Sequence, residues 1–364
     1  MKIAYVIRPN LEKLPPVMSQ LYALSEQGHD ITVISTKVSK YVKNLYIDSN
    51  ITFVSLQKVK PDRGLFQKII NIIRFRQLVK KHLNGDEKSV VWIGSVDTAV
   101  YCKDIFYTHK RTVLNIFELY DRFPKILNRI QRIAQNSLAV IVPEYNRAHI
   151  LKVWLRLDRT PVVIPNKPYF WETEPDSDTI KVMKKLADCN KKIVLYQGWI
   201  SEERDISRIA EAMNSMPEKD KYILVLMGPL SGEKTLRIIR EKYPNLIHIP
   251  YLSPPQHLHI TEMAYIGIAS YDDSSLNTIF CAPNKIYEYA MKNVPILARN
   301  IPGLVYTVES GSVGVCVDTY DIESIVDGIR LLDRNHSYYQ GNMEDFLKKS
   351  DIGSKIQEII RLIS

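Results

Sequence analysis

The second half of the chain contains the stretch CAPNKIYEYA, residues 281–290, which predicts a loop that passes directly into a helix. Pro283 suits the start of a helix, and Asn284 is a good N-cap residue. Free N–H groups at a helix N-terminus can hold a phosphate, and Lys285 adds a positive charge at that point. Glu288, one turn from the cap, could reach sugar hydroxyls. The alternative is a capping box that starts a helix and binds nothing.

Strands and helices alternate around this stretch, which predicts parallel sheets and an α/β fold. We expect strands at 2–7, 30–35, 51–56, 90–94, 113–118, 138–142 and 161–164, and then at 192–196, 222–227, 247–252, 266–271 and 294–298. The segment 166–178 is rich in proline and polar residues, as an interdomain linker is. We therefore predict two doubly wound Rossmann-like domains facing across a cleft. They span residues 1–168 and 169–345, and a helix in 346–364 packs back on the first domain.

The composition of the chain excludes several classes of protein. The 364 residues are 45% hydrophobic and 24% charged, as in soluble globular proteins, and the formal charge of +9 predicts anionic partners. The four cysteines are far apart and form no metal pattern, which favours free thiols in a reducing cytoplasm. The first residues enter a strand at once, leaving no room for a signal peptide, and no apolar run reaches the ~18 residues of a membrane span. No nucleic-acid-binding module is present. We expect a cytoplasmic protein.

Two predicted helices of the first half are basic and amphipathic. In the helix at 65–83, apolar residues such as Phe66, Ile69 and Ile73 recur at helical spacing. The basic residues of the two helices are Lys68, Arg74, Arg76, Lys80 and Lys81 in the first, and Arg129 and Arg132 in the second, which follows Asp121. Such helices could lie on an anionic membrane surface. The alternative is a pair of core helices whose exposed sides are basic.

Several candidate site residues lie at or just after the carboxyl ends of predicted strands, at the edge where open parallel sheets bind ligands. In the second half they are Gly198, Arg204, Tyr251 and Tyr271. Gly198 allows a backbone to approach a ligand, Arg204 opens the following helix, and either tyrosine could border a base or be a half-buried strand residue. In the first half they are Glu118 and Asp121, which could instead lie in a solvated loop, with Asp121 as the cap of the next helix. No metal site is expected.

These motifs together resemble the GT-B glycosyltransferases, and specifically family 4 (group 1). The resemblance rests on APNKIYEYA at 282–290 with NVPILA at 293–298 and IPG at 301–303, on LYQG at 195–198 with Arg204, on VLMG at 225–228, and on PVVIPN at 161–166. It covers most of the chain. Two family features are absent: Phe280 stands where the first glutamate of the E-x7-E signature falls, and Arg8-Pro9-Asn10 replaces a glycine-rich loop.

The resemblance implies a donor site in the second domain and an acceptor site in the first. Lys285 and Arg204 would hold the diphosphate of a UDP- or GDP-sugar, Glu288 the ribose hydroxyls, and Pro283 and Asn284 would add backbone contacts. The reaction would be a hexosyl transfer to a hydroxyl, retaining and without a metal or other cofactor. The acceptor could be a lipid-linked saccharide in polysaccharide synthesis, met at the inner membrane face.

Three alternatives remain open at this point. An inverting reaction would need a base, for which Asp121, Glu118 or Asp97 are candidates. A sugar-nucleotide epimerase could share the same architecture and would need no acceptor. A degenerate binding subunit without activity is favoured by Phe280 and opposed by the presence of Lys285 and Arg204.

Overall fold

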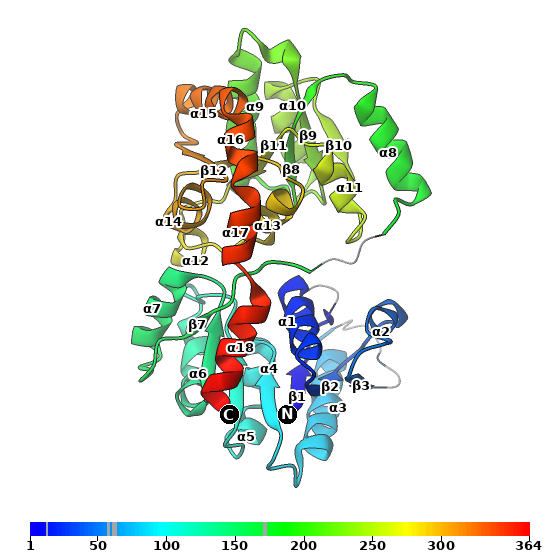
Figure 1. Cartoon of the computed structure of the whole chain (residues 1–364), viewed down its shortest axis with the longest axis vertical. Helices are drawn as coiled ribbons and strands as arrows, with labels where there is room; N and C mark the ends of the chain where they lie inside the picture. The colour runs from blue at the N-terminus through cyan, green and yellow to red at the C-terminus, as the bar shows by residue number, and fades with distance from the viewer. Residues whose placement is uncertain (12–13, 57–58, 60–63, 170–172) are drawn as a thin grey trace. The chain divides into compact units, whose positions relative to one another are not determined.

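The computed structural model describes residues 1–364 with the exception of 12–13, 57–58, 60–63 and 170–172. The chain forms two compact units, one made of residues 1–169 and 351–364 and the other of residues 170–350 (Figure 1). Each is a parallel α/β unit, so the predicted fold class of two doubly wound domains is confirmed. Among the described residues, no helix is long and apolar enough to cross a membrane.

The first unit is built on a seven-stranded sheet with the order β3-β2-β1-β4-β5-β6-β7. Its strands are β1 (Lys2–Ile7), β2 (Asp30–Ser35), β3 (Ile51–Ser55), β4 (Val90–Ile93), β5 (Thr112–Asn115), β6 (Ala139–Val142) and β7 (Val162–Val163). Every pairing is parallel. The chain builds outward from β1 in one direction and from β4 in the other. The carboxyl ends of β1 and β4 are therefore the topological switch point, where such sheets bind ligands.

Helices accompany this sheet along the chain. They are α1 (Pro15–Glu26), α2 (Lys40–Leu45), α3 (Leu65–Leu83), α4 (Val96–Tyr101), α5 (Lys103–Phe106), α6 (Pro124–Asn136), α7 (Tyr145–Trp154) and α18 (Ile352–Ile363). The last of these, red in Figure 1, packs on α1, and Gln27 Nε2 donates a hydrogen bond to the Gly353 carbonyl at 2.8 Å. Four isoleucines, spaced to share one helix face, are buried in α18: Ile352, Ile356, Ile359 and Ile363.

The second unit repeats the plan with six parallel strands in the order β10-β9-β8-β11-β12-β13. They are β8 (Lys192–Gln197), β9 (Tyr222–Met227), β10 (Ile247–Ile249), β11 (Ile266–Ala269), β12 (Ile296–Arg299) and β13 (Gly314–Val317). Side chains alternate between two core clusters, with Val194 and Tyr196 in one and Ile193 and Leu195 in the other. This alternation is that of a strand covered on both faces by helices. The switch point of this sheet lies between β8 and β11.

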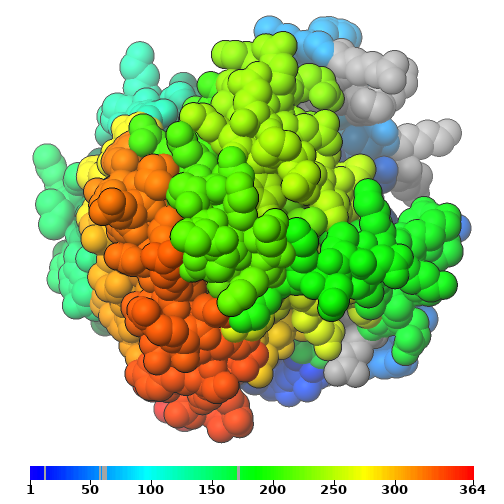
Figure 2. All heavy atoms as spheres, turned by 90° about the horizontal axis from the view of Figure 1, so that it is seen from above, coloured from blue at the N-terminus to red at the C-terminus, as the bar shows by residue number. Residues whose placement is uncertain are grey.

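The helices of the second unit divide between these two faces. With the shorter helical turns, they are α8 (Ser177–Ala187), η2 (Glu202–Arg204), α9 (Ile206–Ser215), η3 (Lys219–Lys221), α10 (Glu233–Lys242), α11 (His257–Glu262), α12 (Leu276–Ile279), α13 (Asn284–Met291), α14 (Pro302–Leu304), η4 (Val305–Glu309), α15 (Ile322–Arg334), α16 (His336–Gly341) and α17 (Met343–Lys349). α9 packs against both α10 and α15. In Figure 2, α9 is green, α10 is yellow-green and α15 is orange. α8, α11, α13 and α17 contribute to the other core cluster.

The helix predicted from the stretch at 281–290 is held tightly against the sheet. A Cβ atom on Gly267 of β11 would lie 2.6 Å from the Tyr289 ring, so only glycine allows α13 to pack this closely. The Tyr289 hydroxyl donates to the Leu195 carbonyl at 2.9 Å and lies 3.2 Å from the Ile268 carbonyl. These contacts fix α13 over the carboxyl ends of β8 and β11.

Several predicted boundaries are corrected. Pro283, and not Asn284, is the N-cap of α13, and no side chain caps this helix. α6 begins at Pro124 with Phe123 as its N-cap, so Asp121 does not cap it. β10 ends at Ile249, which places Tyr251 in a loop. The helix predicted at 65–83 has those bounds in the structure.

Candidate functional site

Two glycines shape the loop that follows β8. Gly198 has φ 121° and Gly228, after β9, has φ 139°, conformations that side-chain-bearing residues rarely adopt. A Cβ on Gly228 would lie 2.1 Å from the Gly198 carbonyl oxygen, and a Cβ on Gly198 would lie 3.4 Å from Lys285 Nζ. Gly198 therefore lets the main chain run beside the Lys285 side chain, and its predicted approach to a ligand stays a prediction.

Two cations and two aromatic rings meet at this switch point. Lys285 Nζ lies 4.0 Å from the centre of the Tyr196 ring and 5.4 Å from that of Tyr271. The Arg204 guanidinium lies over the same Tyr271 ring at 4.1 Å. Tyr271 follows β11, Arg204 ends η2 and Lys285 lies in the first turn of α13, so the three come from separate segments of the chain.

The electrostatics of this cluster favour an anion. Arg204 Nε and Nη1 are buried and have no hydrogen-bond partner in the part of the chain that the structure describes. Burial, and then the nearby Arg204 charge, lower the pKa of Lys285 from its ordinary value to about 7. Two cations close together in a largely buried site repel each other. A bound anion reduces this repulsion, because it supplies the missing countercharge. The uncapped N-terminus of α13 adds free N–H groups beside them.

Glu288 lies one helical turn beyond Lys285 and is 9% exposed. Gln197 Nε2 donates a hydrogen bond to Glu288 Oε2, and Gln197 Oε1 accepts one from the Thr261 hydroxyl at 2.8 Å. His257 Nε2 lies 3.6 Å from Glu288 Oε1. Gln197, Thr261 and His257 were not predicted as site residues. Only Gln197 carried a signal, because it directly precedes Gly198 in the quoted motif.

The remaining predicted donor-site residues differ in position. Pro283 is buried at the N-cap of α13, and Asn284 opens the helix. Tyr251 is 64% exposed in the loop after β10, whereas burial raises the pKa of the Tyr271 hydroxyl well above its ordinary value. Tyr271 therefore faces the two cations as an aromatic surface.

The predicted carboxylates of the first half belong to the first unit. Glu118 Oε2 lies 3.5 Å from Arg147 Nη1, which also donates to the Phe117 carbonyl. Asp97 accepts two hydrogen bonds from Arg8, through its Nε and, at 2.9 Å, its Nη2. Arg8 follows β1 and Asp97 lies in the first turn of α4, which follows β4, so this ion pair lies at the switch point of the first sheet. Asp121, between β5 and α6, is partly exposed.

The basic helix α3 is placed differently from what its pattern suggested. Its core-facing residues are Asn71, Phe75, Val79 and Leu83, whereas Phe66 is 78% exposed, Ile69 45% and Ile73 48%. Arg76 pairs with Asp104 at 2.8 Å, and Arg132 lies over the Tyr107 ring at 4.9 Å, so both are engaged within the unit. Five of the predicted basic residues are exposed, namely Lys68, Lys80, Lys81, Arg129 and Arg132, and Arg74 and Arg76 are partly exposed.

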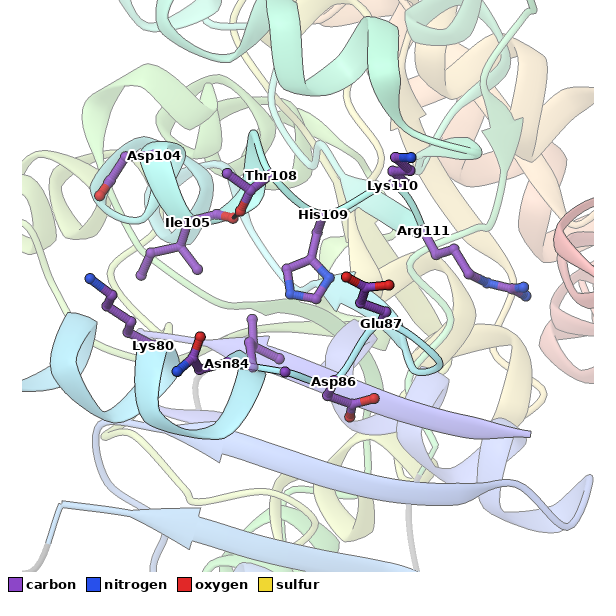
Figure 3. A pocket seen from close by; sticks show the side chains of 12 residues that line it. Lys80, Asn84, Asp86, Glu87, Asp104, Ile105, Thr108, His109, Lys110 and Arg111 are labelled. Carbon is purple, nitrogen blue, oxygen red and sulfur yellow. Dashed lines mark hydrogen bonds between the residues drawn. The ribbon is translucent and has the colours of Figure 1, made fainter.

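A separate pocket of about 560 Å³ lies between the end of α3 and the segment 104–111 (Figure 3). The lining segments directly precede β4 and β5, so the pocket is at the amino end of these strands and away from the switch point. In the described part of the chain, no group of three His, Cys, Asp or Glu residues is placed to hold a metal ion.

Comparison with known proteins identifies the class. Residues 178–341 match the family described as glycosyl transferases group 1. The second unit thus carries a group 1 glycosyltransferase domain, and the predicted resemblance to group 1 is confirmed for that domain, while the whole chain shares the GT-B fold. No curated protein matches the sequence.

Solved structures share the fold over the whole chain at low sequence identity. Anabaena HepE in complex with UDP and glucose has a TM-score of 0.68 and 13% identity, over 99% of this chain and 98% of HepE. A glycosyltransferase from Rickettsia africae has a TM-score of 0.66 and 15% identity, over 100% and 97% of the two chains. Sucrose-phosphate synthase from Thermosynechococcus elongatus has a TM-score of 0.65 and 14% identity, over 99% and 94%.

Proposed function

We propose that this chain transfers a sugar from a UDP-sugar to a hydroxyl group of a saccharide acceptor. The observation that carries the proposal is a pair of cations, the buried Lys285 and the half-buried Arg204, that share the Tyr271 ring at the switch point of the second sheet. UDP is favoured among nucleotides because HepE, which has the same fold, was solved with UDP and with UDP-glucose.

In this mechanism the leaving group is a nucleoside diphosphate, on which negative charge develops as the glycosidic bond breaks. Lys285 and Arg204 stabilise that charge electrostatically, as does the N-terminus of α13. Glu288, oriented by Gln197, accepts hydrogen bonds from the ribose hydroxyls. We propose that the reaction retains the anomeric configuration and needs no metal ion.

We propose the first unit as the acceptor site, centred on the carboxyl ends of β1, β4 and β5. Glu118 and Asp121 follow β5, and the Arg8–Asp97 pair lies beside them along the sheet order. The Glu118 side chain is 51% exposed and that of Asp97 33%, so Glu118, together with Asp121 three residues later, is the better candidate for contact with the acceptor hydroxyl.

We further propose that the acceptor is a lipid-linked saccharide used in polysaccharide synthesis, and that the protein meets it peripherally at the cytoplasmic face of a membrane. The support is α3, which exposes Phe66, Ile69 and Ile73 together with Lys68 and Lys80. Exposed apolar side chains beside lysines are the features by which amphipathic helices bind anionic bilayers.

The decisive experiment is a thermal-shift and hydrolysis screen against UDP-, GDP- and ADP-sugars. We expect stabilisation by UDP and slow release of UDP from one UDP-sugar. Lys285→Ala should lose most of the UDP-dependent shift. Lys292→Ala is the matched control, because Lys292 follows the same helix and pairs with Glu262 at 2.8 Å away from the cluster.

The outcomes separate the alternatives. No stabilisation by any nucleotide diphosphate contradicts the proposal. Binding without hydrolysis or transfer would indicate a binding subunit, and formation of an epimerised sugar without an acceptor would indicate an epimerase. With a working acceptor, the anomeric configuration of the product, measured by NMR, tests retention. Activity that is unchanged by a chelator supports metal independence.

A further inference from the structure

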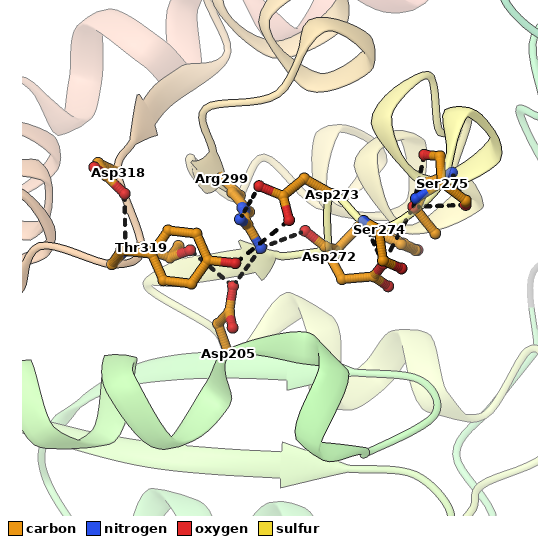
Figure 4. A network of polar contacts seen from close by, with 11 residues as sticks. Asp205, Asp272, Asp273, Ser274, Ser275, Arg299, Asp318 and Thr319 are labelled. Carbon is orange, nitrogen blue, oxygen red and sulfur yellow. Dashed lines mark hydrogen bonds and ion pairs between the residues drawn. The ribbon is translucent and has the colours of Figure 1, made fainter.

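Arg299 is the last residue of β12 and is 4% exposed, although it carries a full charge. Its guanidinium connects two loops of the second unit (Figure 4). Nη1 donates to Asp205 Oδ2 at 2.6 Å and to the Tyr271 carbonyl at 3.2 Å, and Nη2 donates to Asp273 Oδ2 at 2.8 Å. The Tyr320 ring covers the guanidinium at 4.5 Å. A buried arginine with this many fixed contacts holds its partners in one geometry.

The first of these loops carries Arg204. Asp205, the next residue, has φ 51°, in the left-handed region that costs energy for residues other than glycine. Asp205 is the N-cap of α9, yet its side chain makes no capping hydrogen bond. The carboxylate is used instead to accept from Arg299 and, at 2.8 Å, from the Thr319 hydroxyl. These two hydrogen bonds stabilise the backbone conformation of Asp205, and the backbone at Asp205 in turn fixes the direction of the neighbouring Arg204 side chain.

The second loop carries Tyr271. Arg299 binds the main chain of Tyr271 through its carbonyl and binds Asp273 two residues later. The neighbouring Asp272 fixes the loop further by accepting from the backbone N–H of Ser274 at 2.9 Å. The Tyr271 ring is the surface on which Arg204 stacks and which Lys285 faces. The Arg299 guanidinium therefore contacts both loops that form the Arg204–Tyr271 stack.

We propose that Arg299 is a positioning residue for the donor diphosphate. By holding Asp205 and the 271–273 loop together, it aims Arg204 Nε and Nη1 at the phosphate position. Arg299 acts through Asp205 and Tyr271 and is not itself a phosphate ligand. This inference rests on the proposed function, because it assumes that the cluster of Arg204 and Lys285 binds a nucleoside diphosphate.

The test is the dissociation constant of UDP, measured by calorimetry well below the melting temperature of each variant. We expect Arg299→Met to weaken UDP binding roughly tenfold, as is usual when the groups that orient a ligand-binding residue are lost. Arg299→Lys should recover part of the affinity, since one ammonium cannot bridge Asp205 and Asp273 as the guanidinium fork does. Lys192→Met is the matched control: it breaks the ion pair with Asp333 at the opposite end of β8.

A double-variant cycle shows whether Arg299 acts through Arg204. In an Arg204→Met background, Arg299→Met should cost much less than in the wild type, because the group it positions is gone. Fully additive losses overturn the proposal, as does an unchanged UDP affinity in Arg299→Met. A lowered melting temperature with unchanged affinity assigns Arg299 a purely structural role and also overturns it.

Two further results keep the test decisive. If Arg299→Met does not fold, Asp205→Asn replaces it, because asparagine tolerates the left-handed conformation but bonds more weakly to Arg299. A several-fold loss of UDP affinity is expected there, and no loss contradicts the proposal. If the wild-type protein does not bind UDP, the proposed function fails together with this inference. If it does bind UDP and the variants bind equally well, only this inference fails.

Discussion

The ammonium group of Lys285 lies 4.0 Å from the centre of the Tyr196 ring and is bound to no carboxylate in the described part of the chain. Burial and the neighbouring Arg204 charge lower the pKa of Lys285 to about 7, against an ordinary value of 10.5. In the unliganded protein this lysine is therefore close to half protonated at neutral pH. A bound diphosphate favours the ammonium form, so ligand binding and proton binding are coupled.

The first prediction is a pH dependence of UDP affinity. Above about pH 7 the free site has lost its proton and the occupied site keeps it, so binding takes up a proton. Affinity should fall as pH rises between about 7.5 and 9, by up to about tenfold per pH unit. The phosphate of UDP, with a pKa near ~6, is already ionised in this range. Calorimetry in buffers of different ionisation enthalpy measures the proton uptake directly.

Lys285→Arg is the control for this coupling. Arginine stays protonated throughout the range, so the variant should bind UDP with little dependence on pH. An equal pH slope in the wild type and in this variant would show that another group carries the proton.

The second prediction concerns stability. The folded-state pKa of Lys285 is depressed, so between about 7 and 10.5 the unfolded chain binds more protons, and the unliganded protein gains stability as pH rises through that window. Lys285→Met removes the cost of burying this amine. We expect its melting temperature to exceed that of the wild type by several degrees at neutral pH, with UDP binding lost. The difference between the two proteins should shrink as the pH approaches 10. A lower melting temperature for the variant at pH 7 would contradict the assignment.

The sequence predicted which residues follow strands at one edge of the second sheet, and this brought Gly198, Arg204, Tyr271 and Lys285 into one group. The reason is topological: parallel strands end at a common edge, so residues after separate strands become neighbours. Glu288 was found from its spacing to Lys285 on one helix. Their roles as ligands of the donor stay predictions.

Other parts of the site could not be predicted in this way. Arg299 ends a strand like many other residues, and its partners Asp205 and Asp273 are far from it in the chain. The orientation of α3 was also undetermined, because apolar residues cover two of its faces. The face with Phe75 and Val79 packs on the core, and the face with Phe66 does not. Which face is buried depends on the tertiary contacts of the helix with neighbouring strands, and these contacts cannot be read from the pattern of the helix alone.

The third prediction tests the orientation of Glu288. Gln197→Leu removes the donor that holds one carboxylate oxygen and the acceptor for the Thr261 hydroxyl. If Glu288 binds the ribose, UDP affinity should fall about three- to tenfold, since an imprecisely oriented carboxylate loses part of a hydrogen bond. Discrimination between UDP and 2′-deoxy-UDP should shrink at the same time.

Thr235→Val is the control for this variant, because it removes another buried hydroxyl of the same unit, hydrogen-bonded at 2.8 Å to Ser231. It should leave both affinities unchanged. An undiminished preference of Gln197→Leu for UDP over 2′-deoxy-UDP would separate Glu288 from ribose recognition.

The fourth prediction concerns the packing of α13. Gly267→Ala places a methyl group 2.6 Å from the Tyr289 ring, which must move and weaken its hydrogen bond to Leu195. We expect a loss of about 1–3 kcal/mol in the free energy of unfolding, measured by denaturant titration. Gly341→Ala is the control, because its added methyl group meets no atom within 4 Å and the expected change is within ~0.5 kcal/mol. Equal stability of the two variants would show that α13 does not depend on this contact.

The last prediction tests the proposed membrane surface, defined here by Phe66, Ile69, Ile73, Lys68 and Lys80. The three apolar side chains point into solvent along one side of α3, where they have no counterpart to bury against in the described first unit. Insertion into the boundary of a bilayer would remove them from water, and the lysines would attract anionic lipid headgroups.

We therefore expect flotation of the protein with vesicles that contain anionic lipid and weaker flotation with zwitterionic vesicles. High salt should reduce binding, because it screens the lysines and leaves the apolar contacts intact. Replacing Phe66, Ile69 and Ile73 by serine should abolish binding even at low salt. Val153→Ser is the control, since Val153 is 74% exposed on α7 of the same unit. Binding that depends on salt but survives the triple serine replacement would mean that charge alone attracts the protein, and that α3 does not insert.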